Sequence, residues 1–173
     1  MTLDGACDHT TGIADEELHQ HYADLIESAD VLLYGRTTFQ LMQYWQELLK
    51  NPSGNTTMDD FAISIDRIPK LVFSRTLQDT GWRTATLSNK PLDEKVLELK
   101  QQDGKNILVG SRSLIIQLLN SNRIDELQIC IHPFIEGVGL RLFDRITDRI
   151  ELMFIKTKPL KSGATVLCYE PMK

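Results

Sequence analysis

The sequence predicts an α/β fold with a mixed, mostly parallel central sheet, helices on both faces, and an antiparallel C-terminal part. Over the first two thirds of the chain, short apolar segments that stop at polar or glycine-containing loops alternate with segments of helical spacing. Continuous apolar segments of this length are typical of strands that are buried on both faces. The last third is rich in β-forming residues separated by Gly- and Pro-containing turns, which indicates antiparallel strands.

The individual elements follow from the spacing of apolar residues and from the breaks between them. Acidic residues open the first helix, and Pro91 suits the start of a later one because a missing N–H costs nothing there. The expected helices cover residues 15–28, 37–49, 59–65, 91–102 and 114–119. The expected strands cover residues 31–34, 71–73, 84–88, 106–109, 127–132, 151–158 and 165–169. Trp82 follows Thr80-Gly81 and is expected to be a partly exposed loop residue.

Length and composition predict one folded domain that covers residues 1–173. The chain has 173 residues, of which 42% are apolar and 25% charged, which is ordinary globular usage and too apolar for a disordered chain. No linker, internal repeat or low-complexity segment divides the sequence. One core of good size is therefore expected.

Charge and hydropathy argue against two classes of partner. The formal net charge is -5 and no block of like charges occurs, so a nucleic-acid backbone would be repelled. The longest apolar segments are far shorter than the roughly 20 residues that cross a bilayer. The N-terminus carries neither a basic leader nor an apolar signal core, so we expect a cytoplasmic protein that binds neither nucleic acid nor membranes.

The cysteines and histidines predict no metal site. Cys7, Cys130 and Cys168 are far apart and include no Cys-x-x-Cys pair, and the last two fall in expected strands as small buried residues. His19 and His21 are two positions apart on the first helix, so they face different directions.

Three loops, each following an expected strand, have the composition of an anion site. Gly35-Arg36-Thr37-Thr38 and Ser74-Arg75-Thr76 each combine a cation with hydroxyl groups, and Gly110-Ser111-Arg112-Ser113 leads into a helix. Ligands of open α/β sheets lie at the carboxyl ends of the strands, where helix N-termini and Arg side chains bind phosphates. The alternative for each loop is that its glycine only begins a helix and its Arg is solvated. Neither a Gly-x-Gly-x-x-Gly fingerprint nor a P-loop is present.

An ordered set of short motifs resembles the dihydrofolate-reductase-like superfamily, and specifically stand-alone proteins similar to the C-terminal reductase domain of bifunctional riboflavin-biosynthesis deaminase/reductases. The resemblance implies a dihydrofolate-reductase-like three-layer fold over nearly the whole chain. The matching motifs are Leu3-Asp4-Gly5, Ala29-Asp30 with Leu32–Phe39, Ile68-Pro69-Lys70 with Val72–Leu77, Ile107–Ser111, Asp125-Glu126-Leu127, His132-Pro133 with Gly137-Val138-Gly139, and Leu142-Phe143.

The resemblance implies NADPH as the cofactor and a hydride transfer to a small heterocyclic or sugar-derived substrate. It places Arg36 and Thr37 near the phosphates, Ser74 and Arg75 beside the adenosine 2′-phosphate, and Gly110, Ser111, Arg112 and Ser113 at the pyrophosphate. Gly35, Thr38 and Thr76 complete the expected cofactor contacts. The implied reaction is similar to that of 5-amino-6-(5-phosphoribosylamino)uracil reductase or dihydrofolate reductase. A homodimer is also implied, formed through the β-rich C-terminal third.

The chain departs from the riboflavin reductases at positions that concern the substrate. Val109 stands where those enzymes have Glu before the cofactor turn, Ser111 replaces the second Gly, and Gln43-Tyr44-Trp45 replaces an acidic pair before a Pro. The carboxylate that holds the pterin in dihydrofolate reductases could correspond to Asp15, Glu16 or Glu17, with dipole stabilisation of the helix as the alternative role. Asp4, Trp45 and His132 are candidates for the substrate pocket, with packing as the alternative.

The resemblance also implies a central strand ahead of Leu3-Asp4-Gly5, so we expect either an earlier native start or another segment in that place. Two further functions stay open beside the reductase. One is a non-catalytic nucleotide- or metabolite-binding homodimer, and the other is a structural homodimer whose pocket is vestigial.

Overall fold

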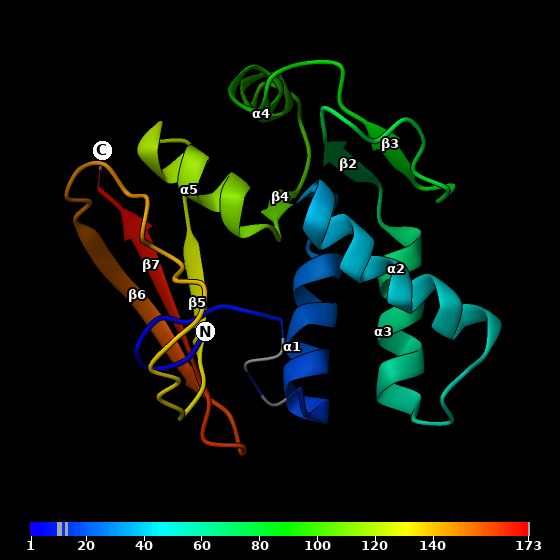
Figure 1. The fold of residues 1–173 in the computed structure, drawn as a ribbon, viewed down its shortest axis with the longest axis horizontal. Helices are drawn as coiled ribbons and strands as arrows, with labels where there is room; N and C mark the ends of the chain where they lie inside the picture. Colours follow the sequence, from blue (N-terminus) through cyan, green and yellow to red (C-terminus); the bar gives the residue numbers. More distant parts are fainter. Residues whose placement is uncertain (10–11, 13, 173) are drawn as a thin grey trace. The chain divides into compact units, whose positions relative to one another are not determined.

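The computed structural model describes residues 1–9, 12 and 14–172 and divides the chain into two compact units (Figure 1). One unit is Leu18–Ile115, and the other joins Met1–Glu17 with Ile116–Lys173. The expectation of a single domain stays a prediction. No helix among the described residues is long and apolar enough to span a membrane.

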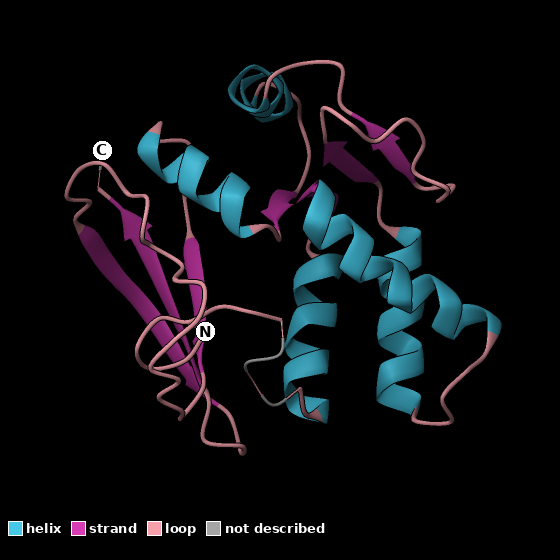
Figure 2. Ribbon diagram, viewed as in Figure 1, coloured by secondary structure: helices cyan, strands magenta, loops and turns pink. Residues whose placement is uncertain are grey.

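The unit Leu18–Ile115 is built on a four-stranded parallel sheet in the order β3-β2-β1-β4. Figure 2 colours the strands magenta and the helices cyan. The strands and helices alternate along the chain, as the sequence predicts. The strands are β1 (Ala29–Gly35), β2 (Lys70–Phe73), β3 (Ala85–Leu87) and β4 (Asn106–Val109). The helices are α1 (Glu16–Glu27), which begins just before this unit, α2 (Arg36–Lys50), α3 (Thr56–Arg67) and α4 (Leu92–Lys100), and α5 (Arg112–Asn120) starts at its end.

The central strand β1 is buried on both faces, as its continuous apolar sequence predicts. Leu32 and Tyr34 alternate onto one face and pack in a core that α1, α2 and α3 share through Ile26, Phe39 and Ile65. Leu33 points to the opposite face and is also fully buried. The sheet is therefore covered on both sides, and the loops that follow its strands are the parts open to a ligand.

Two helix starts in this unit differ in a way that the apolar spacing could not predict. α3 begins at Thr56, earlier than expected, because the Asn55 side chain caps it by accepting a hydrogen bond of 3.1 Å from the Met58 amide. α2 follows β1 directly, and its cap residue Gly35 offers no side-chain acceptor. The first turn of α2 therefore lacks the side-chain cap that Asn55 provides for α3 and is open to an external acceptor.

The other unit carries the antiparallel sheet that the sequence predicts for the C-terminal third. Its strands β5 (Leu127–Ile131), β6 (Leu152–Pro159) and β7 (Thr165–Pro171) pair in the order β5-β7-β6. Thr2 adds an isolated parallel bridge to His132, just beyond β5. The parallel and antiparallel parts form two separate sheets, whereas the sequence predicted one mixed sheet.

The expected exposure of Trp82 is wrong, because this side chain is only 3% exposed. Its ring lies 4.2 Å from the ammonium of Lys70, and its Nε1 donates a hydrogen bond of 2.6 Å to the Asp66 carboxylate. The Lys70 ammonium, itself 1% exposed, donates to the carbonyl of Ile68 at 2.9 Å and to the Thr84 hydroxyl at 3.0 Å. These contacts hold the loop before β3 against the end of α3.

Burial makes Lys70 a source of pH-dependent stability. Burial lowers the pKa of Lys70 to about 8 from an ordinary value of 10.5, although nearby Asp66 acts in the opposite direction. Between these values the unfolded chain binds the extra proton, so the folded state gains stability as the pH rises. Between pH 8 and 10 the free energy of unfolding of the wild type, relative to that of Lys70→Met, should rise by up to about 1.4 kcal/mol per pH unit. Chemical unfolding across this range measures the difference, with exposed Lys50→Met as the control; a constant difference would contradict the assignment.

Candidate functional site

Three loops gather at one edge of the parallel sheet, as the sequence predicted. Residues 35–38 follow β1, residues 74–76 follow β2, and residues 110–113 follow β4. β1 is paired in parallel with β2 on one side and with β4 on the other, so the carboxyl ends of all three strands share an edge. The loops are therefore neighbours in space, although the residues that join them are up to 76 positions apart in the sequence.

A buried hydrogen bond joins the first loop to the third. The amide of Gly35 donates to the Ser111 hydroxyl oxygen at 2.8 Å, and Ser111 is only 1% exposed. A Cβ atom at position 35 would lie 3.3 Å from the Ser113 hydroxyl, so glycine permits the close approach of the two loops. Ser111 was predicted to contact a cofactor; in the structure its hydroxyl holds Gly35.

A second hydrogen bond joins the first loop to the second. The Arg36 guanidinium donates to the Thr76 hydroxyl at 2.7 Å. The second loop is itself shaped by Ser74, whose hydroxyl oxygen accepts from the amides of Thr76 at 3.2 Å and Leu77 at 3.0 Å. These bonds leave Arg75 exposed, with no hydrogen bond or ion pair to any described residue.

The combined loops form an electropositive surface that fits a phosphate group. Arg36 and Arg75 are both exposed, Arg112 is half-buried, and none of the three loops contains a carboxylate. The open first turn of α2 presents its amide groups beside Arg36 and Thr37. An anion with several oxygens would find backbone donors, hydroxyls and guanidinium groups at one place.

The close packing of Tyr34 against Gly110, at the start of the third loop, is a feature that the sequence did not reveal. A Cβ atom at position 110 would lie 2.7 Å from the ring of Tyr34, so only glycine fits beside this buried side chain. Burial raises the pKa of the Tyr34 hydroxyl, which stays neutral. The signal in the sequence is weak, because it requires knowing that β1 and β4 are adjacent.

His132, a candidate for the substrate pocket, lies beyond the end of β5 in the other unit. It is 6% exposed, its Nε2 is 3.8 Å from the Cys130 sulfur, and its ring stacks on Phe134 with 6.4 Å between centroids. Its Nδ1 is buried and has no hydrogen-bond partner among the described residues. Burial lowers the pKa of His132, with the nearby N-terminal amine acting in the same direction and Asp15 against it. The imidazole is therefore neutral at pH 7.

Asp4, also a candidate for that pocket, uses its carboxylate to hold two loops together. One oxygen accepts from the Thr2 hydroxyl at 2.6 Å and the Glu136 amide at 3.1 Å. The other accepts from the Gly137 amide at 2.8 Å and lies 2.8 Å from the Arg141 guanidinium. Hydrogen bonds, above all that from Thr2, keep the pKa of Asp4 far below its usual range. Arg141, which also donates to the Asp4 carbonyl, did not stand out in the sequence.

The remaining candidates lie on α1 and α2 or directly beside them. Asp15 directly precedes α1 and Glu16 is its first residue, while the neighbouring Glu17 accepts a hydrogen bond of 2.8 Å from the Lys161 amide. Trp45 is half-buried on α2 and packs edge-on against Phe61 of α3, with 4.7 Å between ring centroids. Roles for Asp15, Glu16 and Trp45 in the reaction stay predictions.

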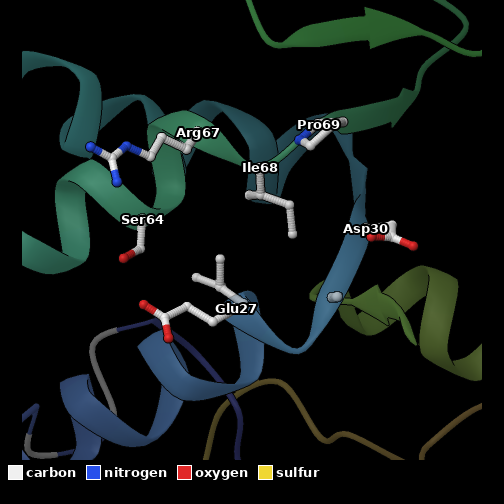
Figure 3. Close-up of a pocket in the computed structure, with 8 residues that line it drawn as sticks. Glu27, Asp30, Ser64, Arg67, Ile68 and Pro69 are labelled. Atoms are coloured by element: carbon white, nitrogen blue, oxygen red, sulfur yellow. The ribbon is translucent and has the colours of Figure 1, made fainter. Parts of the chain in front are cut away.

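A hollow of about 340 Å³ lies at the opposite edge of the parallel sheet (Figure 3). It is lined by the beginning of β1 and by the residues just before β2, and Glu27, Ser64 and Arg67 surround it. Because β1 and β2 are parallel, this hollow is at their amino ends and the three loops are at their carboxyl ends. The hollow is therefore no part of the loop site.

The parallel sheet with its loop site and the separate antiparallel sheet make this an α/β protein. Comparison with known families agrees with this class, since the model of the RibD C-terminal domain matches residues 1–166. The chain belongs to the RibD C-terminal domain family.

Relatives with known sequences or structures support the same assignment. The Bacillus subtilis protein YyaP is 32% identical over 98% of this chain and 90% of its own length, and YwjB of the same organism is 26% identical over 79% of this chain and 71% of its own. Both are uncharacterized proteins.

Two solved structures share the fold at low sequence identity. A protein from Shewanella sp. PV-4 named for riboflavin biosynthesis has a TM-score of 0.70 at 18% identity, over 99% of this chain and 95% of that one. A pyrimidine reductase-like protein from Corynebacterium diphtheriae has a TM-score of 0.66 at 15% identity, over 99% of this chain and 89% of that one.

The bond between Gly35 and Ser111 should contribute measurably to stability. Ser111→Ala leaves the buried Gly35 amide without its acceptor, which should lower the free energy of unfolding by about 1–3 kcal/mol. Urea unfolding measures the change, and the exposed Asn89 of the same unit provides the control variant Asn89→Ala. Equal stability of the two variants would show that the bond contributes nothing.

The Asp4 carboxylate should make stability depend on acid pH. Its pKa is lower in the folded chain than the ordinary value of 3.8, so its stabilising effect is complete above that value and is lost as the pH falls through the folded pKa. Asp4→Asn turns an amide N–H₂ toward donors and should lower the melting temperature at pH 7. The difference in melting temperature between Asp4→Asn and the wild type should become smaller below pH 4. The exposed control Asp79→Asn should show no such trend. A gap that is independent of pH would reject the role of the charge.

Proposed function

We propose that this protein is an NADPH-dependent reductase that transfers a hydride to a small heterocyclic or sugar-derived substrate. The observation that carries the proposal is the joining of three Arg- and hydroxyl-bearing loops by the Gly35–Ser111 and Arg36–Thr76 hydrogen bonds at one edge of the parallel sheet. Membership of the RibD C-terminal domain family supports a reductase-like role. A solved structure of the same fold is named a pyrimidine reductase-like protein, which supports the heterocyclic substrate class.

The residues at this edge suit the phosphates of a dinucleotide. The open first turn of α2, with Arg36 and Thr37, supplies donors for a phosphate, and the start of α5 supplies a second helix N-terminus for the pyrophosphate. Arg75 is an exposed guanidinium next to Ser74 and Thr76, a set that suits a 2′-phosphate because Arg binds phosphate oxygens in pairs. This set would favour NADPH over NADH.

Bound NADPH would supply the hydride, and the protein would orient the cofactor and exclude competing reactions. His132 belongs to the other unit, and its predicted contact with a polar ligand stays a prediction; it is neutral and its buried Nδ1 has no partner among the described residues. A neutral imidazole can donate or accept one hydrogen bond at that atom, according to its tautomer. Asp4 fixes the loop that carries Glu136 and Gly137 within the same unit.

A non-catalytic nucleotide-binding protein is the second candidate function. It is favoured by the absence of any carboxylate in the three loops and by Val109, an apolar residue directly before the third loop. Loss of NADPH absorbance in the presence of a pterin or pyrimidine would establish the reductase. NADPH binding without turnover of any member of both compound classes would favour the binding protein.

Arg75 should distinguish the two nicotinamide cofactors. NADPH at a hundredfold excess over its dissociation constant should raise stability by about 2.7 kcal/mol. Arg75→Ala removes a charged hydrogen-bond donor worth about 1.5–3 kcal/mol, so NADPH affinity should fall about tenfold to a hundredfold while NADH affinity stays unchanged. Calorimetric titration measures both, and exposed Arg83→Ala of the same unit is the matched control.

Two outcomes of that titration would contradict the proposal. If neither nucleotide binds the wild type, the cofactor assignment is wrong. If Arg75→Ala weakens NADPH and NADH equally, Arg75 does not recognise the 2′-phosphate.

A further inference from the structure

The hollow at the amino ends of β1 and β2 lies wholly within the unit Leu18–Ile115. Its volume of about 340 Å³ is at the lower end of the range for small-molecule sites, which is roughly 300–1,000 Å³. Its apolar lining comes from the ends of α1 and α3 and from the residues next to them: Ile26, Ala29, Ile68 and Pro69. A small ligand with an apolar part would fit there.

Two opposite charges border the hollow without being used by the fold. Glu27 is the last residue of α1 and Arg67 is the last residue of α3, and both side chains are exposed. Neither side chain has a hydrogen bond or an ion pair with any described residue. The two groups do not pair with each other, so each is available to a ligand.

The carboxylate of Glu27 is at a position that helix electrostatics disfavour. The carboxyl end of a helix carries partial negative charge, which repels an acid in the last turn, and α1 has no basic residue in its last turn. Lys105 donates to the main-chain carbonyl of Glu27 at 3.1 Å, but no ion pair among the described residues joins it to the Glu27 carboxylate. An acid here does not stabilise α1, which fits a role in binding a cation.

Ser64 adds a hydrogen-bond acceptor between the two charges (Figure 3). Its hydroxyl donates to the Asp60 carbonyl at 3.1 Å, so the oxygen is left to accept from a ligand. Asp30, the other acid of the lining, accepts from a backbone amide at 2.6 Å, and its carboxylate points away from the hollow in Figure 3. Glu27 and Ser64 therefore offer acceptors to a primary ammonium. Arg67 offers paired donors to a carboxylate.

We infer that this hollow binds a small zwitterion, an α-amino acid with an apolar side chain. The ammonium of the ligand donates to the Glu27 carboxylate and the Ser64 hydroxyl, and its carboxylate accepts from the Arg67 guanidinium. Its side chain covers Ile26 and Ile68. The ligand thereby joins the ends of α1 and α3, each of which contributes one charge. The site is separate from the loops of the proposed function, because it lies at the opposite ends of the same strands.

Titration of isotope-labelled protein with L-leucine and L-phenylalanine locates the ligand by amide chemical shifts. The shifts should cluster at residues 26–30 and 64–69, while the amides of residues 35–38 and 74–76 should not move. L-Leucinamide lacks the carboxylate and N-acetyl-L-leucine lacks the ammonium, so each should bind about fivefold more weakly than L-leucine. No shifts with either amino acid, or equal binding of L-leucine and its two derivatives, would overturn the inference.

Charge variants assign the two ends of the ligand. Glu27→Gln should weaken L-leucine about fivefold and leave the affinity for N-acetyl-L-leucine unchanged, because that compound has no ammonium. Arg67→Gln should weaken L-leucine to the same extent and leave the affinity for L-leucinamide unchanged. The exposed residues Glu47 and Arg83 of the same unit provide the controls Glu47→Gln and Arg83→Gln, which should bind as the wild type does.

The outcome that rejects the assignment is a variant that weakens L-leucine and both derivatives equally, because the charge would then act on the fold and not on one end of the ligand. NADPH titration of the same variants reports separately on the proposed function.

Discussion

The hydrogen bond from the Gly35 amide to the Ser111 hydroxyl connects the two strands on which the candidate site depends. β1 and β4 are adjacent in the parallel sheet, and the loops that leave them must pass close to each other at its edge. Glycine at position 35 allows that approach, and a buried serine at position 111 satisfies an amide that would otherwise lose a hydrogen bond to water. The Arg36–Thr76 bond then extends the connection to the loop after β2. For this reason the three loops, each of which is only a weak signal in the sequence, form one surface.

The two units use buried or bonded charges for different purposes. In the parallel unit the Lys70 ammonium lies over Trp82 and at the end of α3, where it donates a hydrogen bond to the Ile68 carbonyl. In the other unit the Asp4 carboxylate holds the loop around Gly137 with the help of Arg141. Both charges are structural. The exposed guanidinium of Arg75, in contrast, has no partner among the described residues and is suited to a ligand.

Most elements could be predicted because their cause is local. The apolar run Val31–Tyr34 and the helical spacing after Gly35 depend on residues a few positions apart. The position of the three loops also followed, since parallel strands bring their carboxyl ends to one edge. The start of α3 was predicted too late because Asn55 acts through a cap, which apolar spacing does not report.

Features that depend on distant partners could not be predicted. Trp82 is buried because Asp66 and Lys70 bind it, 16 and 12 positions earlier in the chain. Asp4 and its partner Arg141 are 137 positions apart in the sequence, so their ion pair could not be predicted. The sequence therefore indicated Asp4 as a candidate for the substrate pocket. The role of Ser111 depends on strand order, which the residue pattern alone left open. The separation into two sheets likewise depends on backbone pairing between segments far apart in the chain.

The most direct measurement of the central claim is a titration of isotope-labelled protein with NADPH, followed by amide chemical shifts. The account predicts that the largest shifts lie at residues 35–38, 74–76 and 110–113, and that those of Arg36, Thr37 and Arg75 are among them. Shifts confined to Glu27, Ser64 and Arg67 around the hollow at the other edge of the sheet, or no shifts at all, would contradict it.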